Sequence, residues 1–294
     1  MKQWAVVSGP ASLEIGATLA AKLGTKLSRV DTNDFPDGES KVRIFDEMRN
    51  KSVIVVQSLY PPTDKHLYLL LLIAHKLSED GADVSAAIPY LAYARQDREF
   101  LKGEVISLGV VAHLFRSVGI RRMVTVDIHS AQGLGLFSIP AYSCSAIPLL
   151  AEYISKNRDL NNPIAVSPDF GSSTRVEAFA AVLKSEYVSF KKTRNRETGE
   201  IVTEGERLNL GGRDAVIIDD MISTGTSVIK CAHLLKKFGV NKIIAACTHP
   251  LMVGGAIDKM KAAGVDELIS SNTIPSKYSK VDVAPLLASY FERL

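Results

Sequence analysis

The 294-residue sequence contains few cysteines, and none is placed for a metal site or a redox motif. Cys144, Cys231 and Cys247 show no CxxC spacing, and the last two lie inside apolar segments, where a small buried thiol is the ordinary interpretation. This composition argues against a disulfide framework and a zinc site. It predicts a protein of the reducing cytoplasm.

Long apolar runs and strong charge are also missing. The longest apolar run, residues 67–74, has eight residues, whereas a membrane helix needs about 20. The apolar stretch before Pro10 is too short for a signal peptide. The formal net charge is +3 and no basic run occurs, which differs from the charge of a nucleic-acid-binding protein. We therefore expect a soluble globular protein that spans no membrane and binds no nucleic acid.

Short β-branched runs alternate with segments of helical periodicity, which is the pattern of parallel α/β units. Most predicted strands are apolar throughout, as expected for strands that helices cover on both faces. The predicted strands are 5–8, 52–57, 83–88, 123–126, 164–166, 215–218 and 242–246. The predicted helices are 64–79, 107–118, 172–183, 227–238 and 283–291.

Two pairs of similar stretches indicate an internal duplication. "AHKLSEDG" at residues 74–81 resembles "AHLLKKFG" at 232–239, an offset of 158 residues. Ser8 and Ser167, in "VVSGP" and "AVSPD", are offset by 159. We interpret the chain as two duplicated domains, 1–145 and 146–294. The alternative is that α/β units resemble one another in any case.

The stretch "VIIDDMISTGTS", residues 216–227, carries two adjacent acids, Asp219 and Asp220, called the acid pair below. A strand ending at the acid pair would place both carboxylates at the carboxyl edge of a parallel sheet, where open α/β folds bind ligands. The loop that follows opens a helix, and its N–H groups and hydroxyls suit a phosphate monoester. Its residues, called the anion loop below, are Ser223, Thr224, Gly225, Thr226 and Ser227.

The carboxylates of the acid pair would repel a phosphate, but they suit the neighbouring hydroxyls of a sugar. A phosphosugar therefore fits both halves of the motif. The alternative is that the acid pair forms a turn and Ser223 caps a helix.

The motif resembles the phosphoribosyl-binding loop of type I phosphoribosyltransferases and of the ribose-phosphate diphosphokinases (PRPP synthases). Further stretches extend the resemblance to the diphosphokinases, archaeal-type members above all, over essentially the whole chain. It implies an α/β fold of two tandem phosphoribosyltransferase-like domains, each a mainly parallel sheet flanked by helices. It also implies that the chain transfers the pyrophosphoryl group of ATP to the 1-hydroxyl of ribose 5-phosphate, giving PRPP and AMP for nucleotide biosynthesis.

Two stretches predict the nucleotide site. "FPDGES", residues 35–40, combines turn chemistry with an aromatic ring that can stack on a base. "YARQDR", residues 93–98, carries two arginines suited to phosphate oxygens, although a solvated charged loop is the alternative. By resemblance, the first stretch reaches adenine across a subunit interface, which implies a homo-oligomer, at least a dimer. The resemblance assigns to ATP the residues Phe35, Asp37, Glu39, Arg95, Gln96, Asp97 and His129.

"VTVDIHS", residues 124–130, and "SPDFGS", residues 167–172, each place an acid after a predicted strand. Mg²⁺ favours few protein ligands together with waters and substrate phosphates, so a magnesium site is preferred over a zinc site. By resemblance, His129, Asp127 and Asp169 serve the metal, and Asp169 also serves ribose 5-phosphate.

Residues 191–213 form a stretch rich in charge and glycine, without a strong helical period, which predicts a mobile lid; a solvated hairpin is the alternative. The resemblance makes Lys192 and Arg194 catalytic, and Arg194 also binds ribose 5-phosphate. We name no general base.

Three positions, in two stretches, depart from the family pattern. Many members carry a Ser-Arg pair at a regulatory phosphate site, where this chain has Lys102 and Gly103, so we expect weak activation by phosphate or none. Thr226 stands where many members have a second glycine. The rival functions are a phosphoribosyltransferase and an inactive regulatory relative. A P-loop kinase is excluded, because the sequence contains no Gly-Lys dipeptide.

Overall fold

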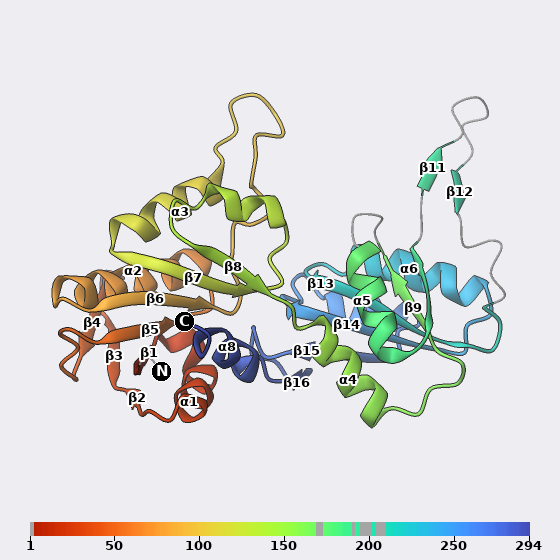
Figure 1. Cartoon of the computed structure of the whole chain (residues 1–294). Helices are drawn as coiled ribbons and strands as arrows, with labels where there is room; N and C mark the ends of the chain where they lie inside the picture. Colours follow the sequence, from red (N-terminus) through yellow and green to blue (C-terminus); the bar gives the residue numbers. More distant parts are fainter. Residues whose placement is uncertain (1–2, 169–172, 190–191, 195–200, 204–209) are drawn as a thin grey trace. The chain divides into compact units, whose positions relative to one another are not determined.

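The computed structural model describes residues 3–168, 173–189, 192–194, 201–203 and 210–294 (Figure 1). The chain divides into two compact units, unit 1 and unit 2. Unit 1 is Met1–Ser145 with Asp282–Leu294, and unit 2 is Ala146–Val281. No helix in the described ranges has the length and apolarity to cross a membrane.

Unit 1 is built on a six-stranded sheet in the order β2-β1-β5-β6-β7-β8, with every neighbouring pair parallel. Its central strands are apolar and buried, because helices cover both of its faces (Figure 1). The strands are β1 (Trp4–Ser8), β2 (Leu27–Ser28), β5 (Ser52–Val56), β6 (Asp83–Ile88), β7 (Ile120–Val126) and β8 (Ala141–Cys144).

Four α-helices flank this sheet. α1 (Leu13–Lys22) packs against α8 (Ala284–Phe291), whereas α2 (Thr63–Glu79) and α3 (Ser107–Ser117) contact the central strands. Two 3₁₀ segments, η1 (Pro10–Ser12) and η2 (Ala131–Leu136), complete the unit. A separate antiparallel hairpin, β3 (Val30–Asp34) and β4 (Ser40–Ile44), carries the "FPDGES" turn.

Unit 2 repeats the same strand order, β10-β9-β13-β14-β15-β16, again with parallel neighbours. The strands are β9 (Ile164–Ser167), β10 (Glu186–Ser189), β13 (Asp214–Ile222), β14 (Lys242–Pro250), β15 (Glu267–Ser271) and β16 (Ser279–Val281). The helices are α4 (Ile147–Asn157), α5 (Ser173–Leu183), α6 (Thr226–Lys237) and α7 (Ala256–Ala262). A two-stranded ribbon is formed by β11 (Lys192–Arg194) and β12 (Ile201–Thr203).

The two faces of the unit 2 sheet carry separate hydrophobic cores. Ile217 of β13 belongs to the core that includes residues of α6 and α7, and Ile218 belongs to the core that includes residues of α4 and α5. This alternation follows from the two-residue period of a strand. It means that consecutive residues of β13 face different helices.

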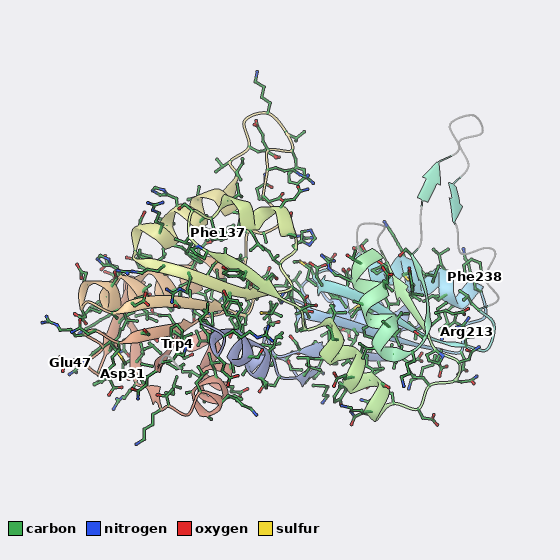
Figure 2. The ribbon with its side chains drawn as sticks, viewed as in Figure 1. Trp4, Asp31, Glu47, Phe137, Arg213 and Phe238 are labelled. Atoms are coloured by element: carbon green, nitrogen blue, oxygen red, sulfur yellow. The ribbon has the colours of Figure 1, made fainter. Side chains whose placement is uncertain are left out.

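Two helices pack in a different unit from the strand that precedes them. α4 follows β8 of unit 1 but packs against α5 in unit 2, and α8 follows β16 of unit 2 but packs against α1 in unit 1. Trp4, labelled in Figure 2, meets Phe291 of α8 edge to face, with ring centroids 5.3 Å apart. The division at 145/146 expected from the sequence assigned residues 282–294 to the second domain, whereas they belong to unit 1.

The predicted fold class, mainly parallel sheets flanked by helices, is confirmed. The predicted strand 215–218 is too short, because β13 continues to Ile222 alongside β14, which continues to Pro250. The predicted strands do not include β3 and β4, so the hairpin that carries the "FPDGES" turn was missed.

Candidate active site

The acid pair lies inside β13 and not after its end, which corrects the expectation from the sequence. Parallel pairing with β14 continues past the acids, where Met221 pairs with His249 and Ile222 with Pro250. Consecutive strand residues start from opposite faces, so the Asp219 side chain leaves the strand on the face of Ile217 and that of Asp220 on the face of Ile218, although both carboxylates reach Arg175. The two carboxylates therefore have different surroundings.

Asp219 is the more accessible member of the acid pair. Its side chain is 12% exposed, against 2% for Asp220. One oxygen of Asp219, Oδ1, accepts a hydrogen bond of 2.9 Å from the backbone N–H of Asp220. Burial, together with the neighbouring charge of Asp220, raises the pKa of Asp219 to about 8.

Arg175 of α5 provides positive charge beside the acid pair. Its Nη1 donates a hydrogen bond of 2.8 Å to Oδ1 of Asp220 and lies 3.8 Å from Oδ1 of Asp219. Arg175 was not among the site residues predicted from the sequence. The available signal was physical, because two adjacent buried acids require a nearby cation.

The anion loop follows β13 and opens α6. Gly225 occupies the left-handed region with φ of 75° at the N-cap of α6. The loop is held from residues 252–253, because Val253 N donates to Ser223 O at 3.0 Å. Thr224 Oγ1 and Thr226 Oγ1 lie 3.0 Å apart. The first turn of a helix leaves its N–H groups without partners in the helix, so the loop presents donors suited to phosphate.

Unit 1 holds different residues at the positions of the acid pair. Ser8 of β1 corresponds to Ser167 of β9 in the sequence repeat. The pairing of β1 with β5 and of β9 with β13 then makes Gln57 correspond to Asp219, and Ser58 to Asp220. Gln57 is buried, and its amide bonds Ala11 N at 3.3 Å and His66 O at 3.2 Å. Neutral side chains engaged with the backbone thus replace the two carboxylates in unit 1.

The "FPDGES" turn joins β3 and β4 and projects its side chains outward. Phe35 is 48% exposed, and Asp37 and Glu39 are also exposed. Gly38 N donates to Phe35 O at 2.9 Å, and Asp37 Oδ1 accepts from Glu39 N at 3.1 Å. The turn therefore satisfies its own backbone and leaves the aromatic ring accessible to a ligand or a partner.

The "YARQDR" stretch lies in the connection between β6 and α3. Arg95 is exposed, Gln96 is partly buried, and Gln96 Nε2 donates to Glu104 at 3.1 Å. The side chain of Asp97 is nearly buried. A Cβ added at Gly133 would lie 3.6 Å from Asp97 Cβ, so this stretch lies beside the segment that follows β7.

The start of α2 links the two predicted nucleotide stretches. Lys65 forms an ion pair with Asp34 at the end of β3, and Asp64 accepts a hydrogen bond from the Tyr93 hydroxyl. This hydrogen bond raises the pKa of Tyr93 to about 12. The predicted nucleotide residues thus share one framework in unit 1.

Asp127 and His129 follow β7, as expected. Asp127 is buried, has φ of 37°, and its N–H donates to Cys144 O at 2.8 Å, whereas His129 is exposed. Across the described part of the chain, no three His, Cys, Asp or Glu side chains gather as a metal site. One or two protein ligands suffice for Mg²⁺, which keeps waters and binds substrate phosphates, so Asp127 and His129 fit that ion better than a metal needing a full protein cage.

Three predicted residues have no described side chains. Asp169 lies outside the described residues, and Lys192 and Arg194 are described only by their backbone in β11. β11 pairs antiparallel with β12, and Arg194 is opposite Ile201. Short strands therefore occur within the segment 191–213, for which the sequence analysis predicted a lid.

Comparison with known proteins identifies the family. Residues 4–119 match the N-terminal domain of ribose phosphate pyrophosphokinase, and residues 188–288 match the phosphoribosyl synthetase-associated domain. The ribose-phosphate pyrophosphokinase of Sulfurisphaera tokodaii is 35% identical, over 96% of this chain and 98% of the relative. That of Methanothermobacter thermautotrophicus is 38% identical, again over 96% of this chain and 98% of the relative.

A solved structure agrees with the sequence relatives. The phosphoribosylpyrophosphate synthetase of Mycobacterium smegmatis is 30% identical, superposes with a TM-score of 0.87, and the match covers 100% of both chains. The predicted resemblance, including that to archaeal members, is thereby confirmed. A TM-score and coverage this high extend the agreement to both duplicated halves. The chain belongs to the ribose-phosphate pyrophosphokinase family.

Proposed function

We propose that this chain transfers the pyrophosphoryl group of ATP to the 1-hydroxyl of ribose 5-phosphate, giving PRPP and AMP. The observation that carries the proposal is the acid pair within β13, followed directly by the anion loop at the start of α6. Family membership supports the same reaction.

Ribose 5-phosphate binds to unit 2 in this proposal. The anion loop receives the 5-phosphate through backbone N–H groups and the hydroxyls of Ser223, Thr224, Thr226 and Ser227. The carboxylates of the acid pair accept hydrogen bonds from the ribose hydroxyls. Asp169 and Arg194 add contacts to the same sugar phosphate.

ATP binds to unit 1 in this proposal. Phe35 stacks on the adenine base, and Asp37 and Glu39 accept hydrogen bonds from it. Arg95 and Gln96 hold the phosphates and the base, and Asp97 supports them. The exposed ring of Phe35 fits a turn that serves a neighbouring subunit, so we expect a homo-oligomer, at least a dimer.

Mg²⁺ is the proposed cofactor, with Asp127, His129 and Asp169 as its protein ligands. When bound, it neutralises charge on the phosphate oxygens of ATP. The donor set of one buried carboxylate and one exposed imidazole in unit 1 leaves room for substrate phosphates.

The reaction needs alignment and charge neutralisation more than covalent help. The 1-hydroxyl oxygen attacks the β-phosphorus and its proton is released to solvent, the bond from this phosphorus to the α-phosphate oxygen breaks, and AMP leaves with that oxygen. Lys192 and Arg194 neutralise the charge that develops on the transferred group and on AMP. A closed lid would also exclude water, which competes for the pyrophosphoryl group. The three cysteines are free thiols, which agrees with a protein that acts in the reducing cytoplasm.

The decisive experiment incubates the protein with ATP, Mg²⁺ and ribose 5-phosphate and separates the nucleotide products. AMP and PRPP in equal amounts support the proposal. ADP without AMP would indicate an ordinary kinase and reject it. Conversion of added PRPP and a nucleobase to a nucleotide would instead indicate a phosphoribosyltransferase.

A further inference from the structure

Arg175 connects α5 to the acid pair from one face of the unit 2 sheet. Asp220 shares the sheet face of Ile218, which packs with the core that includes α5 residues, and Arg175 meets Asp220 on that face. Asp219 follows Ile217 by two residues in β13, and the core of Ile217 includes residues of α6, the helix that the anion loop opens, but the Asp219 carboxylate also comes within 3.8 Å of Arg175 Nη1. Arg175 therefore holds the acid pair from α5, and the anion loop follows the acid pair in sequence.

The contact of Arg175 is directional. Its Nη1 lies 2.8 Å from Asp220 Oδ1, a charge-assisted hydrogen bond, but 3.8 Å from Asp219 Oδ1. The Arg175 side chain is 22% exposed, whereas that of Asp220 is 2% exposed. A buried carboxylate without a cation is costly, so this bond fixes the position of Asp220.

Asp219 depends on Asp220 in turn. The backbone N–H of Asp220 donates to Asp219 Oδ1 at 2.9 Å, so a shift of residue 220 moves the donor that orients Asp219. A chain of two hydrogen bonds thus runs from the Arg175 guanidinium through Asp220 to the more accessible carboxylate. Each bond has ordinary geometry.

We propose that Arg175 is a positioning residue for ribose recognition: it anchors Asp220 from α5 and thereby sets the direction in which the acid pair presents its oxygens to the sugar hydroxyls. This inference rests on the proposed function, because it assumes that the acid pair receives ribose. It assigns Arg175 to selection of the sugar and not to the transfer step.

The test compares ribose 5-phosphate with 2-deoxyribose 5-phosphate, which lacks one hydroxyl but keeps the phosphate. In Arg175→Gln we expect the KM for ribose 5-phosphate to rise roughly tenfold or more, with little change in the KM for ATP. We also expect the preference for ribose over deoxyribose, as a ratio of kcat/KM values, to fall by a similar factor. Arg175→Lys keeps the charge without the planar fork and should restore part of the preference.

Arg213→Gln is the matched control. Arg213, labelled in Figure 2, also forms an ion pair in unit 2, donating to Glu186 at 2.6 Å and to the carbonyl of Asn162 at 3.0 Å. Its loss should weaken the unit without changing the sugar preference. If Arg175→Gln lowers kcat/KM equally for both sugars, as Arg213→Gln should, the residue is merely structural and the proposal is wrong.

Calorimetric binding of the two sugar phosphates separates this inference from the proposed function. A wild-type protein that binds ribose 5-phosphate but yields no PRPP would reject the proposed reaction, while the loss of binding preference in Arg175→Gln would still support the positioning role. If Arg175→Gln does not fold, Arg175→Lys decides. An unchanged preference in that variant, with unchanged KM for ribose 5-phosphate, overturns the role of the guanidinium fork.

Discussion

Trp4 and Phe291 are joined near the two ends of the sequence: the indole Nε1 donates a hydrogen bond of 3.1 Å to the Phe291 carbonyl oxygen. Their rings also meet edge to face, and both side chains are buried. The C-terminal helix α8 is therefore part of the core of unit 1.

Phe291→Ala is expected to destabilise unit 1 by about 3–5 kcal/mol, because it leaves a cavity beside Trp4. Trp4 is the only tryptophan in the sequence, so its fluorescence during urea unfolding reports on unit 1. Leu294→Ala is the control, because Leu294 is 50% exposed and its truncation should change little. Equal unfolding midpoints for wild type and Phe291→Ala would contradict the packing role of α8.

Asp219→Asn is expected to change how stability depends on pH. The folded pKa of Asp219 is about 8, above its unfolded value near 3.8, so the folded protein holds this proton more tightly. The stabilisation from Asp219 is therefore complete below about pH 4 and is lost as pH rises to about 8. Relative to the Asn variant, the wild type should lose on the order of a few kcal/mol across this window.

The measurement is urea unfolding of both proteins, without ligands, at several pH values between these limits. Circular dichroism in the far ultraviolet reports on unit 2 as well as unit 1. Stability curves that run parallel for the two proteins would show that Asp219 does not titrate in this range.

Gly225→Ala should impair the anion loop. The residue has φ of 75°, and an added Cβ would lie 3.0 Å from Met260 Cγ and 3.1 Å from its Sδ. We expect a loss of about 1–2 kcal/mol in stability and weaker binding of ribose 5-phosphate, measured by calorimetry. Gly24→Ala separates strain from loop damage, because Gly24 has φ of 65° with no atom within 4 Å of an added Cβ. Equal sugar-phosphate affinity in the two variants would count against the loop.

Lys192→Ala should lower kcat by about 10²–10³-fold, because it removes a positive charge expected to act on the transferred group. The melting temperature should stay close to that of wild type. Lys261→Ala, which removes an exposed lysine of α7, should retain normal turnover. A Lys192→Ala enzyme of near-normal rate would remove the catalytic role assigned to this lysine.

Inorganic phosphate is expected to leave the rate essentially unchanged. Lys102 and Gly103, at the positions of the regulatory Ser-Arg pair, lie in an exposed turn where Gly103 N donates to Glu99 at 2.5 Å. Initial rates should be measured with and without phosphate at constant free Mg²⁺, with sulfate as the salt control. A large increase specific to phosphate would show that the chain has a regulatory site built from other residues.

The sequence predicted the acid pair, the anion loop and the α/β class because these depend on local composition and spacing. The predicted end of β13 was too early, because two acids interrupt the apolar run. Pairing with β14 extends the strand, and this pairing is a tertiary property that local sequence does not show. Arg175 was missed for a similar reason: α5 and β13 are distant in sequence, and only the packed sheet brings this side chain to Asp220.

The packing of α8 into unit 1 was also beyond sequence reasoning. An amphipathic helix shows which of its faces is buried but not which sheet receives that face. Contiguous domains were therefore the simplest expectation, and the packing of α8 against α1 differs from it. The β3–β4 hairpin was missed because β3 is mostly polar and β4 has only two apolar residues in alternation, Val42 and Ile44.

Gln57 and Ser58 of unit 1 correspond to the acid pair of unit 2, so the two units share a strand order but differ in chemistry at these positions. Where the second copy has two adjacent acids, the first has the Gln57 amide and the Ser58 hydroxyl, both hydrogen-bonded to main-chain groups of unit 1. Under the proposed function, unit 2 then binds the pentose, and unit 1 binds the nucleotide. ATP, the pyrophosphoryl donor, and ribose 5-phosphate, the acceptor, therefore cannot exchange their binding sites. The different residues at two positions thus make two units of the same strand order unequal in function.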